Sequence, residues 1–126
     1  MAGELVLIVD DNASNRKLVR DILEFHGYRT LEAETAEAGI ELARANLPDL
    51  VLMDIQLPGM DGFAALSQLR ADPVTASLKV VALTAFAMRE DAARISAAGF
   101  DGYLSKPLAT RQLPDQIRAY CDTPRR

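Results

Sequence analysis

Four side chains in this sequence could together bind a divalent cation and a phosphoryl group. Asp10 and Asp11 directly follow one short apolar run, and Asp54 follows another. Lys106 lies just after a third apolar segment. In an open α/β sheet, ligands bind outside the carboxyl ends of the strands. Three carboxylates there would repel one another, and a hard cation such as Mg²⁺ would relieve that repulsion, while the lysine adds positive charge for a phosphate.

Length and composition are typical of one soluble domain. The chain has 126 residues, and hydrophobic residues make up 49% of it, which is enough to build a packed core. A net charge of −4 with dispersed basic residues argues against a nucleic-acid-binding surface. One cysteine and one histidine allow no internal disulfide and argue against a zinc site. The sequence has no membrane-spanning apolar run and no signal-peptide pattern, so we expect no membrane contact and a cytoplasmic protein.

Hydrophobic patterning predicts five strands that alternate with five helices. The strands are expected at residues 5–9, 28–32, 50–53, 80–83 and 103–104. The helices are expected from Asn12 or Ala13 to Gly27, from the Thr35 cap to Pro48, around residues 63–69, over 88–98, and within 108–120. Because Pro114 cannot sit deep inside the last helix, its regular turns should begin near Leu113.

This alternation predicts a parallel sheet with right-handed crossovers and helices on both faces. For five strands the expected order is 2-1-3-4-5, the flavodoxin-like doubly wound α/β arrangement. The first and third strands are then neighbours. Asp10, Asp11 and Asp54 should therefore meet at the switch point between them.

Four segments of the sequence resemble the receiver domains of two-component response regulators, the CheY-like family. These segments are Val9-Asp10-Asp11-Asn12, the stretch from Met53 to Gly62, Thr84-Ala85, and Lys106-Pro107. Each is a weak signal alone, but all four, in order and at the right strand ends, are highly specific. The resemblance covers almost the whole chain and is strongest to stand-alone receivers of the DivK type. It implies a single receiver domain over residues 1–126, with a core at about 4–122 and no DNA-binding output domain.

The resemblance also implies a role for each site residue. Asp54 corresponds to the phosphoacceptor, which takes a phosphoryl group from a phosphohistidine. Asp10, Asp11 and Asp54, with the backbone carbonyl of Gln56, correspond to the Mg²⁺ ligands. Lys106 would pair first with Asp54 and then with the phosphate. The peptide bond before Pro107, usually cis in the family, would aim the lysine inward.

Thr84 and Tyr103 correspond to the family's switch pair. After phosphorylation Thr84 would hydrogen-bond the phosphate, and Tyr103 would rotate toward the core. The face built by the fourth helix, fifth strand and fifth helix would then change its protein contacts, and the apolar loop around Phe86 and Met88 could be part of a partner site. A bulky Phe86, two residues after Thr84, together with Gln56, two after Asp54, suggests a phosphorylated state of intermediate or long lifetime.

The partners that the resemblance implies are proteins. They are a sensor histidine kinase or a histidine phosphotransfer protein upstream and an effector protein downstream. The chain would be a monomer or a phosphorylation-dependent dimer. It would act once per phosphoryl group and then dephosphorylate itself, so we do not expect a true enzyme.

Other interpretations remain open at this point. A haloacid-dehalogenase-like phosphatase would need a second aspartate two residues after Asp54, where this sequence has Gln56. A flavodoxin would need a first loop that cradles a flavin phosphate, which Asp10 and Asp11 would repel. No Gly-x-Gly-x-x-Gly motif follows the first strand, so a dinucleotide site is not supported. The chain could also be a receiver from a larger regulator or hybrid kinase, or a degenerate receiver that binds partners without phosphate.

Overall fold

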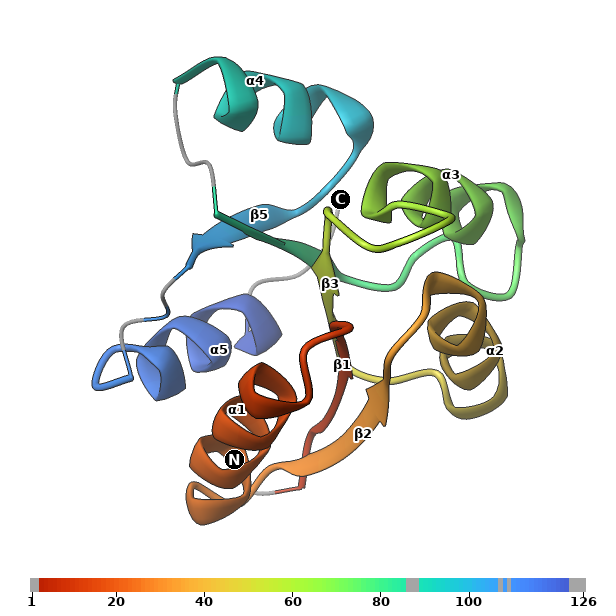
Figure 1. Ribbon diagram of the computed structural model, residues 1–126. Coiled ribbons are helices and arrows are strands. Elements are labelled where there is room, and N and C mark those ends of the chain that lie inside the picture. The colour runs from red at the N-terminus through yellow and green to blue at the C-terminus, as the bar shows by residue number, and fades with distance from the viewer. Residues whose placement is uncertain (1–2, 86–88, 107, 109, 123–126) are drawn as a thin grey trace.

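The computed structural model describes residues 3–85, 89–106, 108 and 110–122, and Figure 1 shows strands and helices alternating along the chain. The strands are β1 (Leu5–Val9), β2 (Arg29–Ala33), β3 (Leu50–Asp54), β4 (Val80–Thr84) and β5 (Gly102–Ser105). The helices are α1 (Ala13–Phe25), α2 (Ala36–Asn46), α3 (Gly62–Ala71), α4 (Arg89–Ala98) and α5 (Leu113–Asp122).

The strands form one parallel sheet in the order β2-β1-β3-β4-β5, which confirms the predicted fold class and topology. Val9, the last residue of β1, is in register with Ala33 on β2 and Met53 on β3. Thr84, the last residue of β4, is in register with Ser105 on β5. The carboxyl ends of all five strands therefore lie at one edge of the sheet, where the sequence predicts the site.

Helices cover the sheet on both faces (Figure 1). Alternate residues of the central strands face opposite ways, as the pleat requires. In β1, Leu7 and Val9 pack with the α2, α3 and α4 side, while Val6 and Ile8 pack with the α1 and α5 side. Both faces of the strand are buried, which explains why the strand reads as a continuous apolar run rather than an alternating one.

Local signals placed the starts of α1, α2 and α5 correctly. Asn12 and Thr35 cap α1 and α2, their side chains accepting the backbone N–H groups of Asn15 and Ala38. Regular turns of the last helix begin at Leu113, as predicted. No helix in the described ranges combines the length and apolar character needed to cross a membrane.

β1 has its predicted bounds, and the other strands differ from the prediction by a residue at one or both ends. β2 runs from Arg29 to Ala33 rather than from 28 to 32, and β3, β4 and β5 extend into the polar residues at their ends. The reason is that ladder hydrogen bonds depend on the neighbouring strand and not on side-chain polarity, so Thr84 and Ser105 still pair. The predicted start of the fourth helix, Met88, lies outside the described residues, and its described turns begin at Arg89.

Two cationic side chains hold the carboxyl ends of α4 and α5, one from the segment before β4 and one from α3. Lys79, just before β4, donates to the carbonyls of Tyr120 and Cys121 at 2.8 and 2.6 Å, at the end of α5. Arg70, near the end of α3, donates to the carbonyl of Gly99, just after α4, at 3.1 Å, and to that of Leu78 at 2.6 Å. These bonds hold the carboxyl ends of α4 and α5 in place.

Candidate functional site

The three predicted acids lie together at the carboxyl edge of the sheet. Asp10 directly follows β1, Asp11 is the next residue, and Asp54 ends β3, the neighbour of β1. One carboxylate oxygen from each lies within 4.8 Å of the others. Asp10 and Asp54 are only 1% and 4% exposed, whereas Asp11 is exposed. The fold thus places two buried carboxylates and one solvent-facing carboxylate around a common point.

Lys106 bridges the two buried acids. Its Nζ lies 2.6 Å from Oδ2 of Asp54 and 3.0 Å from Oδ2 of Asp10. Burial alone would lower the pKa of Lys106, but the hydrogen bonds and charges of Asp54 and Asp10 outweigh it, so the pKa lies above its ordinary value. The ammonium therefore stays charged and balances part of the negative charge that β1 and β3 bring together.

Backbone N–H groups fix the orientation of both buried carboxylates. Gln56 donates its N–H to Oδ1 of Asp54 at 2.8 Å, and Asn12 donates its N–H to Oδ1 of Asp10 at 2.9 Å. In each case one carboxylate oxygen is held by the following loop and the other faces Lys106. The two acids are therefore held in a defined geometry before any ligand binds.

The donor set fits a magnesium ion. Magnesium prefers hard oxygen ligands, keeps several waters, and usually takes only one or two carboxylates from a protein. The three acids of the cluster offer hard carboxylate oxygens, and Asp11 is open to solvent. Gln56 lies beside Asp54 and is exposed, and its backbone carbonyl as a ligand stays a prediction.

The two predicted switch residues, Thr84 and Tyr103, lie on β4 and β5. Thr84 ends β4, is 1% exposed, and accepts the backbone N–H of Lys106 at 2.7 Å through its carbonyl. Tyr103, on β5, is 37% exposed and so does not occupy the core. Thr84 is on the strand next to β3, which carries Asp54, and Tyr103 is one strand further away; their switching roles stay predictions. Phe86, Met88 and Pro107 lie outside the described residues.

Three contributors to the site were not predicted from the sequence. Asn15 places Nδ2 at 3.5 Å from Oδ2 of Asp10, and Arg16 donates to the Asp10 carbonyl at 2.7 Å. Gly62 begins α3 so close to β3 that a Cβ there would lie 2.6 Å from the carbonyl oxygen of Asp54. An Asp-Gly pair such as Asp61-Gly62 indicates a turn, but it gives no sign of this close approach.

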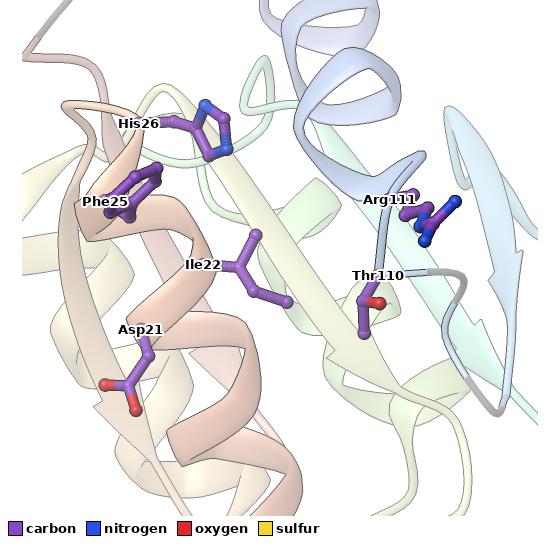
Figure 2. Close-up of a pocket in the computed structure, with 6 residues that line it drawn as sticks. All are labelled: Asp21, Ile22, Phe25, His26, Thr110 and Arg111. Atoms are coloured by element: carbon purple, nitrogen blue, oxygen red, sulfur yellow. The ribbon is translucent and has the colours of Figure 1, made fainter.

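A separate open pocket lies between α1 and the turn that leads into α5 (Figure 2). Its volume is about 420 Å³, and the described residues that line it are Asp21, Ile22, Phe25, His26, Thr110 and Arg111. Neither the three acids nor Lys106 belongs to this lining. The acidic cluster is therefore a site at the sheet edge, distinct from this pocket.

Comparisons with known proteins agree with this geometry. Residues 6–118 match the family model of the response regulator receiver domain. The chain is 41% identical over 115 residues to the polar-differentiation response regulator DivK of Brucella ovis, covering 91% of this chain and 94% of that protein.

Solved structures show the same fold. A putative response regulator from Chloroflexus aurantiacus superposes with a TM-score of 0.89 at 28% identity, covering 96% of this chain and 99% of the other. The receiver domain of the sensor histidine kinase PA1611 from Pseudomonas aeruginosa, with a magnesium ion coordinated in its active-site cleft, gives a TM-score of 0.87 at 30% identity, covering 97% of this chain and all of the other. The chain therefore belongs to the family of response regulator receiver domains.

Proposed function

We propose that this receiver takes a phosphoryl group onto Asp54 from a phosphohistidine, with the help of Mg²⁺, and then changes its protein contacts. The observation that carries the proposal is the bridge from Lys106 to Asp54 and Asp10, two carboxylates that are almost fully buried. Burying two acids is costly unless a positive charge, hydrogen bonds or a metal ion offsets the lost hydration. A cluster that is held oriented but accessible through Asp11 is suited to binding a charged ligand.

The chain's own groups define how Asp54 would react. Its Oδ1 is held by the Gln56 N–H, so the carboxylate presents a fixed face to an incoming phosphorus atom. Attack by a carboxylate oxygen forms a P–O bond while the P–N bond to the donor histidine breaks, which leaves the histidine ring as the leaving group. Lys106, already charged and 2.6 Å from Asp54, can stabilise the oxygens of the transferring group without a large rearrangement.

Asp10, Asp11 and Asp54 would hold the magnesium ion, which offsets charge on the transferring phosphoryl oxygens when it is bound. Asp10 now shares Lys106 with Asp54. In the resting state the lysine therefore balances one of the negative charges of the acids, and the carboxylate oxygens remain the hard donors that the cation needs.

The readout would run through Thr84 and Tyr103. Thr84 is buried at the end of β4, next in the sheet to the strand that carries Asp54, so a new hydroxyl hydrogen bond to the phosphate would pull on the segment after β4. Tyr103 is partly exposed and has room to change its position. A local charge change would thus bias a two-state surface made by α4, β5 and α5, where an effector or a second copy would bind.

The test is the intact mass of the chain after incubation with acetyl phosphate and Mg²⁺. We expect the wild type to gain one phosphoryl group and Asp54→Asn to gain none. Asp61→Asn is the matched control: Asp61 caps α3 outside the cluster, and asparagine can replace it as a cap, so this variant should be phosphorylated normally. Acetyl phosphate replaces the partner, so the assay tests the site independently of any kinase.

The other outcomes are equally informative. Labelling of Asp54→Asn to the same extent as the wild type would place the phosphoryl group elsewhere and refute the role of Asp54. No labelling of the wild type would favour a receiver that binds its partners without phosphate. Continuous release of phosphate over many turnovers would instead make the chain a phosphatase, in conflict with the single-turnover role that we propose.

A further inference from the structure

Arg16 joins three elements beside the acidic cluster. It lies in the first turns of α1, and its side chain is only 14% exposed. Its Nη1 donates to the backbone carbonyl of Asp10 at 2.7 Å, and its Nε donates to Oε1 of Glu32 on β2 at 3.2 Å. Its Nη2 lies 3.9 Å from a carboxylate oxygen of Glu34. One guanidinium thus contacts the end of β1 and the end of β2 at the same time.

The Asp10 carbonyl belongs to the peptide unit that links Asp10 to Asp11. Because a peptide unit is planar, fixing the direction of this carbonyl also fixes where the backbone of Asp11 begins. The N–H of Asp10 is bonded to the carbonyl of Ala33 at 3.1 Å, which holds the preceding peptide unit. Arg16 therefore helps to fix the orientation of the peptide unit that links Asp10 to Asp11.

We propose that Arg16 is a positioning residue for the magnesium site, acting through the Asp10–Asp11 peptide without touching the ion. A guanidinium is planar and donates from several N–H groups in fixed directions, so it can hold a carbonyl and a carboxylate at set angles. Glu32 anchors the guanidinium on the other side. The inference rests on the proposed function, since it assigns to Arg16 the geometry of the ligands that the phosphoryl transfer would use.

The direction of the effect separates positioning from simple electrostatics. Arg16 is positively charged and lies beside the acids, so if its charge were what mattered, removing it would strengthen Mg²⁺ binding. If its hydrogen bond to Asp10 is what matters, removing it would weaken Mg²⁺ binding. Glu32 and Glu34 balance the charge of Arg16, which favours the second effect.

Arg20 supplies a matched control on the same helix. It lies one turn further along α1, and its Nη1 pairs with the other oxygen of the same Glu32 at 2.9 Å. The contacts that the structure gives for Arg20 are to Glu32 and Asp21, and Asp10 is not among them. Replacing Arg20 therefore removes a positive charge and an ion pair to Glu32, and leaves the Asp10 carbonyl bonded.

The experiment is a Mg²⁺ titration, without any phosphoryl donor, of the wild type and of Arg16→Met, Arg16→Lys and Arg20→Met. The backbone amide NMR signals of Asp11 and Asn12 report the dissociation constant. We expect both Arg16 variants to bind Mg²⁺ about 10-fold more weakly, the usual effect of losing a group that orients metal ligands. Lysine keeps the positive charge but lacks the planar set of N–H donors of the guanidinium, so Arg16→Lys should not restore Mg²⁺ binding. Arg20→Met should bind Mg²⁺ like the wild type.

Wild-type affinity in either Arg16 variant, or tighter binding in Arg16→Met, would overturn the proposal. An equal loss in Arg20→Met would also overturn it, because the effect would then come from Glu32 or from general destabilisation. If Arg16→Met does not fold, Arg16→Lys decides the question alone. Acetyl phosphate labelling of the wild type tests the proposed function separately. If the wild type is labelled but the Arg16 variants bind Mg²⁺ with wild-type affinity, only this inference is rejected.

Discussion

Replacing Lys106 with methionine should make the stability of this receiver depend on Mg²⁺. Methionine has nearly the length of the lysine stem but no charge, so the packing of the stem is largely kept. Asp10 and Asp54, which now share the ammonium at 3.0 and 2.6 Å, would face each other without a counter-ion. Both are almost fully buried, so water can replace little of the lost interaction.

The size of the effect follows from burial. Removing one partner of a buried ion pair costs about 3–5 kcal/mol. The Lys106 side chain is 20% exposed, so we take the lower end of that range, about 3 kcal/mol. For a domain of this size each kcal/mol moves the midpoint of thermal unfolding by roughly 3–5 °C, so the midpoint should fall by about 10 °C.

Magnesium should restore much of this loss. The ion would take over the role of the missing ammonium, and the variant should therefore bind it more tightly than the wild type does. Binding that is about 10-fold tighter adds about 1.4 kcal/mol of stabilisation at saturating Mg²⁺. Because the pKa of Lys106 is raised in the folded state, its ion pairs stabilise the wild type fully below the unfolded-state lysine pKa of about 10.4. This stabilisation is lost only as pH rises through the folded-state pKa. Near-neutral pH therefore measures all of it.

The assay is thermal unfolding followed by circular dichroism, near neutral pH, with EDTA and with saturating MgCl₂. Lys17→Met is the control, since Lys17 pairs with Asp21 at 2.7 Å on the surface, both side chains being more than half exposed. An exposed pair contributes about 0–1 kcal/mol, so this variant should unfold near the wild-type temperature and respond normally to Mg²⁺. If Lys106→Met is as stable as the wild type in EDTA, or gains no more from Mg²⁺, Lys106 does not act as the counter-ion of the acids.

Two further residues that support the site, and one partly buried thiol, give additional tests. Gly62→Ala should destabilise the fold by about 1–3 kcal/mol in urea unfolding, because the new Cβ would meet the backbone of Asp54 and Ile55, and an unchanged midpoint would contradict this close approach. Asn12→Ala should cost about 1 kcal/mol in the same assay through loss of the α1 cap, whereas Asn12→Asp should cost little, and equal losses in both would argue against capping. Burial raises the pKa of the Cys121 thiol, so iodoacetamide should alkylate it more slowly than a small-molecule thiol at mildly alkaline pH, with equal rates speaking against burial.

The convergence of the acids could be predicted because it depends on topology alone. Once the strand order is 2-1-3-4-5, the residues that follow β1 and β3 are neighbours, whatever the details of packing. The same holds for Lys106 after β5, whose long side chain can cross the end of β4 to reach Asp54. Residue types at strand ends were therefore a sufficient signal for the cluster.

The supporting contacts could not be predicted in this way. Arg16 meets a backbone carbonyl and a glutamate on another strand, so its role depends on how α1 is rotated over the sheet, and helical spacing does not fix that rotation. The close approach at Gly62 depends on the path of the loop back from β3, which the turn residues indicate only as a change of direction. The carboxyl ends of β2 to β5 were misplaced by a residue because a partner strand decides where pairing stops.

The bonds of Lys79 and Arg70 set a limit on how α4 and α5 can move. Lys79 fastens the carboxyl end of α5 to the segment just before β4, and Arg70 fastens the carboxyl end of α4 to α3 and to the Leu78 carbonyl just before β4. Both helix ends are the ones away from the acidic cluster. A helix held at one end cannot slide along the sheet as a unit while that bond persists, so any motion transmitted from the site must be a swing about the fastened end. The displacement is then largest in the segments that enter α4 and α5 and vanishes near Gly99 and Cys121. At a partner's binding surface, such a swing would chiefly change the angle between the axes of α4 and α5.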